Sequence, residues 1–138
     1  ECLTNGVIQP FEVATGTHPG IISDMQPFYV LLGLHANGTS RVFDYRYPER
    51  LKYCEELSKM YPEMLEWKFG EIKISGKENY KPFSAEVEST DLRGSMAVLM
   101  GALLGDGKSV VNNIEMALRG YNKLEDKLKN LGVEIHIS

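Results

Sequence analysis

Apolar side chains recur along this 138-residue chain at spacings that predict helices and strands. Apolar residues three or four apart predict helices over residues 25–36, 48–60, 92–104 and 120–131. β-rich stretches bounded by turn residues predict strands over residues 11–14, 39–45, 65–69, 71–75, 83–87, 109–111 and 133–137. The expected fold class is therefore α/β, or mixed α+β, because strands and helices alternate.

The predicted helices differ in how their apolar residues are distributed. The helix over residues 92–104 is apolar nearly all round and carries the small residues Gly94, Ala97 and Gly101, so we expect it to be buried on all sides. The helix over residues 120–131 keeps Leu124 and Leu128 on one side and charged residues elsewhere. Apolar helices inside and sheets outside would satisfy this contrast.

The chain also contains an internal repeat. Ser23-Asp24-Met25-Gln26 matches Thr90-Asp91-Leu92-Arg93, and Arg50 and Arg119 precede similar charged helices at nearly the same spacing. We interpret this as two copies of a β-α-β-α-β-β unit, over residues 7–80 and 81–138, with the second copy truncated.

Composition and charge narrow the function classes. The net charge of −4 argues against a general nucleic-acid surface, so an anion site must be made by a few placed cations. The apolar run over residues 94–105 is shorter than the roughly 20 residues a bilayer requires, and no signal peptide is visible, so we expect no membrane contact. Cys2 and Cys54 are too few for a disulfide framework, which fits a reduced, cytoplasmic setting.

The start of the first predicted helix offers the first candidate for chemistry. Ser23 or Asp24 is its expected N-cap, and Pro27 falls in its first turn. Asp24 differs from Asp91 because Gln26 stands where the second copy has Arg93. An ionised Asp24 could accept a proton from a substrate hydroxyl, whereas Asp91 is expected to cap its helix and to orient Arg93.

Arginines near predicted helix starts form the second candidate. Arg50, Arg93 and Arg119 could make an anion cradle, because a helix N-terminus and a guanidinium both favour phosphate or carboxylate. Any one of them alone is more simply a solvated or ion-paired arginine. His18 is expected to line a turn, and no spacing indicates a metal site, a P-loop or another cofactor site.

These motifs as a set resemble the enolpyruvyl transferases over nearly the whole chain. The motifs that carry the resemblance are His18-Pro19-Gly20 with Ser23-Asp24-Met25-Gln26, Glu49-Arg50 before Glu56-Leu57-Ser58-Lys59-Met60, Thr90-Asp91-Leu92-Arg93, and Arg119-Gly120-Tyr121 with Glu125-Asp126-Lys127-Leu128. The resemblance implies a fold of two inside-out α/β barrel domains with buried helices. This chain would supply the C-terminal part of one of them.

The resemblance also implies roles and partners. Asp24 matches the general base on the 3-hydroxyl of UDP-N-acetylglucosamine, in peptidoglycan precursor synthesis. Arg50, Arg93 and Arg119 match arginines that hold phosphoenolpyruvate and its anionic transition state. Ser23, Arg46 and Asp91 are expected to contact substrate. The hydroxyl would add to C2 of phosphoenolpyruvate, and phosphate would then be eliminated.

Departures from the family pattern leave alternatives open. Residues 21–23, 46–49 and 116–118 differ from the family near the site, which allows another acceptor alcohol, such as a different UDP-sugar, a nucleoside or a shikimate-type compound. A non-catalytic binding module on the same scaffold is a further alternative. The second barrel domain, with its reactive cysteine, has no counterpart here and would be supplied in cis or in trans. We therefore expect the isolated 138 residues to be inactive.

Overall fold

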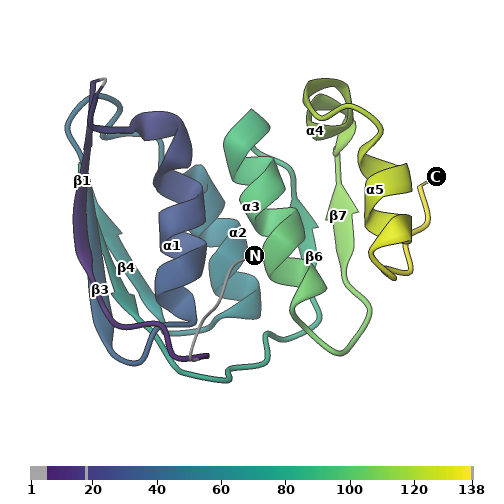
Figure 1. Ribbon diagram of the computed structural model, residues 1–138, viewed down its shortest axis with the longest axis horizontal. Coiled ribbons are helices and arrows are strands. Elements are labelled where there is room, and N and C mark those ends of the chain that lie inside the picture. The colour runs from purple at the N-terminus through teal and green to yellow at the C-terminus, as the bar shows by residue number, and fades with distance from the viewer. Residues whose placement is uncertain (1–5, 18, 138) are drawn as a thin grey trace.

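The computed structural model describes residues 6–17 and 19–137 (Figure 1). A five-stranded sheet lies at one end of the molecule, three helices pack beside it, and a two-stranded sheet and the C-terminal helices follow toward the other end. The central helices are α1 (Gln26–Leu34), α2 (Lys52–Met60) and α3 (Leu92–Leu103). The alternation of strands and helices along the chain, with α1, α2 and α3 beside the larger sheet, confirms the mixed α/β fold class expected from the sequence.

The larger sheet has the strand order β2-β1-β3-β5-β4. Its strands are β1 (Glu12–Gly16), β2 (Ile21–Ile22), β3 (Thr39–Asp44), β4 (Leu65–Lys68) and β5 (Glu71–Ser75). β1 runs parallel to β2 and β3, with Thr15 opposite Asp44, whereas β5 is antiparallel to both neighbours. The smaller sheet pairs β6 (Glu86–Glu88) with β7 (Val110–Asn112) in parallel.

Both halves of the chain begin with the same kind of unit. β1, α1 and β3 form a strand, helix and parallel strand, and β6, α3 and β7 form another. α1 and α3 therefore each follow the first strand of a parallel pair. The division of the chain into repeat units over residues 7–80 and 81–138 stays a prediction.

One apolar core lies between the larger sheet and the central helices. Its members from α1, α2, β3 and β5 are almost fully buried, and they include Val30, Leu34, Val42, Leu57, Ile72 and Ile74. A smaller cluster joins Leu99 of α3 to Leu124 and Leu128 of α5 (Leu124–Asn130). Burial of each large aliphatic side chain stabilises the fold by about 1.5–3 kcal/mol, so these clusters hold the layers together.

Several predicted boundaries are wrong because backbone pairing decides them. The second helix begins at Lys52 and not near Pro48, since the carbonyl of Pro48 accepts a hydrogen bond from the N–H of Gly70 in the β4–β5 turn. The strand expected from Phe83 begins only at Glu86, where the chain pairs with β7. The N–H of Phe83 instead donates to the carbonyl of Met60.

Other differences concern whole elements. The strand β2 and the helix α4 (Glu115–Gly120) were not expected, and the final helix is α5 alone rather than residues 120–131. The strand expected over residues 133–137 does not form, because no neighbouring strand of the described chain pairs with it. The N–H of Val133 instead donates to the carbonyl of Leu128 at the end of α5.

Cys54, on the buried face of α2, lies in the core. Burial raises the pKa of its thiol to about 12, so the thiol stays protonated at neutral pH. Cys2 and His18 lie outside the described residues. Across residues 6–17 and 19–137, no helix is long and apolar enough to cross a membrane.

Candidate active site

A 3-10 turn over Ser23–Met25 leads the chain into α1. Ile22 precedes the turn and Met25 precedes α1, and neither position has a side-chain capping hydrogen bond. The prediction that Ser23 or Asp24 caps this helix is therefore wrong, because the hydroxyl of Ser23 is directed to Asp44. The carboxylate of Asp24 is half exposed and faces two arginines.

Arg50 links the starts of α1 and α3. Its Nη1 donates to Oδ1 of Asp24 at 3.3 Å, and its Nε lies 3.5 Å from Oδ2 of Asp91. The guanidinium also lies over the ring of Tyr47, with 4.5 Å from Cζ to the ring centroid. Arg50 directly precedes Leu51, the N-cap of α2, so it lies near a helix start as expected, at the end of the loop after β3.

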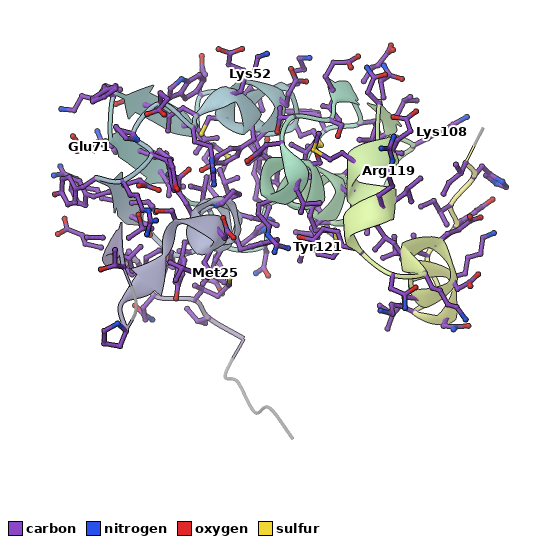
Figure 2. All side chains as sticks on the ribbon, turned by 90° about the horizontal axis from the view of Figure 1, so that it is seen from above. Met25, Lys52, Glu71, Lys108, Arg119 and Tyr121 are labelled. Carbon is purple, nitrogen blue, oxygen red and sulfur yellow. The ribbon has the colours of Figure 1, made fainter. Side chains whose placement is uncertain are left out.

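Arg93 reaches the same carboxylate from the second half of the chain. Its Nε lies 3.9 Å from Oδ2 of Asp24, and its Nη1 donates to the hydroxyl of Tyr121 at 2.7 Å. The hydrogen bond to Tyr121 raises the pKa of the Arg93 guanidinium further above its ordinary value. In Figure 2, Tyr121 lies between the α4 ribbon and Met25, the neighbour of Asp24.

Asp91 caps α3, as the sequence predicted. Its carboxylate accepts the N–H of Gly94 at 3.0 Å. Arg93, which Asp91 was expected to orient, forms its ion pair with Asp24 instead, and Asp91 pairs with Arg50. The ion pairs thus cross between the two halves of the chain and bring Asp24, Arg50, Asp91 and Arg93 together.

The other predicted site residues lie outside this cluster. Arg119 is exposed in the last turn of α4, contrary to its expected place at a helix start, and it has no ion pair with any described residue. Arg46 is also exposed, and its guanidinium lies 5.4 Å from the ring centroid of Tyr47. Ser23 is buried, so its hydroxyl faces the interior.

Sequence reasoning missed several residues around the cluster. Asp44, at the end of β3, is buried and accepts a hydrogen bond from Nε2 of Gln26 at 2.8 Å. The hydroxyl of Tyr53 donates to Oε1 of the same Gln26 at 2.7 Å. The ring of Tyr47 packs against the guanidinium of Arg50, and the hydroxyl of Tyr121 accepts a hydrogen bond from Arg93. The available signals were a lone carboxylate near the end of a predicted strand, for Asp44, and the Arg119-Gly120-Tyr121 motif, for Tyr121.

The arrangement suits anion binding and proton transfer. Exposed ion pairs contribute only about 0–1 kcal/mol to folding, so stability alone accounts poorly for a carboxylate held between two guanidiniums. Arg50 and Arg93 can bind an anion with bidentate geometry, while Asp24 can accept a proton from a neighbouring hydroxyl. Among the described residues, no group of His, Cys, Asp or Glu side chains could hold a metal ion.

Comparison with known proteins assigns the family. The model of EPSP synthase (3-phosphoshikimate 1-carboxyvinyltransferase) matches residues 5–128. The chain therefore belongs to the EPSP synthase family, which confirms the resemblance to enolpyruvyl transferases.

Individual relatives point in the same direction. UDP-N-acetylglucosamine 1-carboxyvinyltransferase of Campylobacter jejuni subsp. doylei is 40% identical over 93% of this chain and 30% of its own length. The enzyme of that name from Streptococcus pneumoniae serotype 2 is 33% identical over 94% of the chain and 30% of its own length. The enolpyruvyl transferase NikO from Streptomyces tendae superposes with a TM-score of 0.84 at 25% identity, over 96% of this chain and 30% of that one.

The chain thus spans about 30% of the length of the relatives it matches.

Proposed function

We propose that this chain is part of a transferase that moves the enolpyruvyl group of phosphoenolpyruvate to the 3-hydroxyl of UDP-N-acetylglucosamine. The observation that carries the proposal is the Asp24 carboxylate held between Arg50 and Arg93. The names of the relatives that match most of the chain support this acceptor. The reaction would serve peptidoglycan precursor synthesis, and the cytoplasmic setting expected from the sequence fits it.

Asp24 acts as the general base in this proposal. The acceptor hydroxyl transfers its proton to the carboxylate as its oxygen bonds to C2 of phosphoenolpyruvate, and C3 takes up a proton. Loss of a proton from C3 and departure of phosphate from C2 then restore the double bond. The half-exposed position of Asp24 leaves room for a substrate hydroxyl to approach.

The arginines hold the anions in this proposal. Arg50 and Arg93 bind the phosphate and carboxylate groups and stabilise the charge that develops in the tetrahedral intermediate. Arg119 joins them from α4 when substrate is bound, because no described carboxylate holds its side chain elsewhere. Arg46 and Asp91 are proposed acceptor contacts. Ser23, also predicted to bind substrate, is buried and donates to Asp44, so in this proposal it supports the neighbouring Asp24 without touching substrate.

The remaining part of the enzyme completes the site in this proposal. The chain matches only about 30% of each relative, so we assign it to the C-terminal part of one inside-out barrel domain. Its partner is the second barrel domain, in cis or in trans. The isolated 138 residues are expected to release no phosphate, because they match only about 30% of each relative and lack the part that would complete the site.

Phosphate release from phosphoenolpyruvate tests the proposal. The chain joined to its missing part is incubated with UDP-N-acetylglucosamine, shikimate 3-phosphate or a free nucleoside as the acceptor. We expect phosphate release with UDP-N-acetylglucosamine as the acceptor and none with the other two acceptors. Release only with another acceptor would reassign the substrate within the family. A complete absence of turnover in a folded protein would favour a non-catalytic binding module.

A further inference from the structure

Asp44 is a buried carboxylate that lies between the two chain segments of the candidate active site. It ends β3 and is only 2% exposed, although an ionised side chain is costly to bury without partners. Its partners come from both segments. One segment is the 3-10 turn and first turn of α1, around Asp24, and the other is the loop that leads from β3 to Arg50.

The α1 side contributes side-chain donors. The hydroxyl of Ser23 donates to Oδ1 of Asp44 at 3.2 Å, and Nε2 of Gln26 donates to Oδ2 at 2.8 Å. Ser23 and Gln26 flank Asp24 and Met25 in the sequence. The hydroxyl of Tyr53 anchors Gln26 from α2 at 2.7 Å. The segment that carries Asp24 is thereby tied to Asp44 on both sides.

The loop side contributes backbone donors. The N–H groups of Arg46 and Tyr47 donate to Oδ1 of Asp44 at 2.9 and 2.8 Å. The loop then places the ring of Tyr47 under the guanidinium of Arg50. One carboxylate therefore connects the segment of Asp24 to the segment of Arg50, whose side chains meet at 3.3 Å.

Only an ionised carboxylate has both oxygens free to accept from these donors, because a protonated carboxyl would place an O–H donor, and an amide an NH₂ group, where an acceptor is needed. Burial on its own would raise the pKa of Asp44. The hydrogen bonds from the backbone of Tyr47 and Arg46, and from the hydroxyls of Thr15 and Ser23, outweigh it and lower the pKa below its ordinary value. Asp44 stays ionised at neutral pH and keeps every acceptor position available.

We propose that Asp44 is a positioning residue for this site, and that it sets the placement of Asp24 relative to Arg50 without touching substrate. The inference rests on the proposed function, in which Asp24 takes a proton while Arg50 holds the anion. Both steps require the two side chains at a defined separation, and small misplacements of catalytic groups can reduce rates up to about 100-fold.

The test compares Asp44→Ala with Tyr61→Phe in the full-length protein. Tyr61 is a suitable control because its buried hydroxyl contacts His35 and the carbonyl of Gly101, at the helix ends away from the site. Two quantities are measured for each variant: kcat for phosphate release per folded molecule, and the NMR signal of the Arg50 side-chain Nε–H. That signal is assigned by its loss in Arg50→Lys.

Asp44→Ala is expected to lower kcat roughly 10- to 100-fold and to shift the Arg50 signal with loss of exchange protection. Tyr61→Phe is expected to lower stability and to leave both quantities unchanged. A folded Asp44→Ala protein with the wild-type Arg50 signal and kcat would overturn the proposal. If Asp44→Ala does not fold, Asp44→Asn takes its place, with smaller changes in the same direction expected and no change overturning it.

The NMR measurement also separates the two proposals. An inactive wild-type protein whose Arg50 signal still depends on Asp44 would remove the proposed function and leave the structural link intact. An active wild-type protein whose Arg50 signal and kcat do not depend on Asp44 would remove the positioning role alone.

Discussion

Arg93 donates a hydrogen bond to the hydroxyl of Tyr121 at 2.7 Å, which ties α3 to the residue that follows α4. The same guanidinium lies 5.4 Å from the centroid of the Tyr121 ring. The other side of Arg93 faces Asp24. Tyr121 therefore limits the orientations in which Arg93 can meet an anion beside Asp24.

Tyr121→Phe is expected to keep the ring contact and to remove the hydrogen bond. Hydrogen bonds to charged groups contribute about 1.5–3 kcal/mol, so we expect kcat/KM for phosphoenolpyruvate to fall roughly tenfold in the full-length protein. Steady-state phosphate release measures the change. Tyr45→Phe is the matched control, because the Tyr45 side chain is exposed and stacks on Phe43. Equal kinetics for the two variants would contradict the role of the Tyr121 hydroxyl.

His35 predicts a pH dependence of stability. Its Nε2 lies 2.9 Å from the hydroxyl of Tyr61, and burial lowers its pKa below the usual 6.5. The unfolded chain therefore binds the proton at a higher pH than the folded chain does. The stabilising contribution of neutral His35 is complete above about pH 6.5 and declines as the pH falls toward the folded pKa.

Urea denaturation between pH 7.5 and pH 5 measures this contribution. His35→Gln should flatten the loss of stability over that interval, because glutamine does not titrate. His136→Gln is the control, since His136 is exposed near the end of the described chain. A wild-type slope that survives in His35→Gln would assign the pH dependence to another group.

Position 76 is expected to tolerate only glycine, because any side chain there would clash with backbone atoms. A Cβ at this position would lie 2.2 Å from the carbonyl oxygen of Gly33 and 2.5 Å from that of Ala36. Both are backbone atoms that cannot move away without shifting the end of α1 or the residues that follow it. Gly76→Ala should therefore lower the free energy of unfolding by about 2 kcal/mol. Gly16→Ala, where a Cβ meets nothing within 4 Å, should change it far less. Denaturant titrations of both variants check this difference.

Local and periodic features were predictable from the sequence. The helix α3 follows from its apolar and small residues, and the Asp91 cap follows from a carboxylate at the expected helix start. The family resemblance followed from ordered motifs. These predictions held because each depends on neighbouring residues or on one face of one element. The expectation that α3 is buried on all sides is wrong, because Met100 and Leu103 on it are exposed.

Pairings between distant segments were not predictable in the same way. The Ser23 hydroxyl had two possible uses, a cap or a buried hydrogen bond, and Asp44, 21 residues away, decides between them. Gln26 was noticed only as the residue in place of an arginine, although it bridges Asp44 and Tyr53. Asp91 was expected to orient Arg93, but Arg93 pairs with Asp24, and Asp91 pairs with Arg50. These pairings depend on how the two halves of the chain pack against each other.

The role of Asp24 as a proton acceptor is tested most directly by phosphate release from the full-length protein with Asp24→Asn. Asp106→Asn is the matched control, because Asp106 is an exposed aspartate paired with Lys81. The amide keeps the size of the side chain and removes its basicity, and general-base catalysis typically contributes about 100- to 10,000-fold. We predict a loss of kcat in that range for Asp24→Asn and none for Asp106→Asn. Wild-type kcat in a folded Asp24→Asn protein would contradict the account.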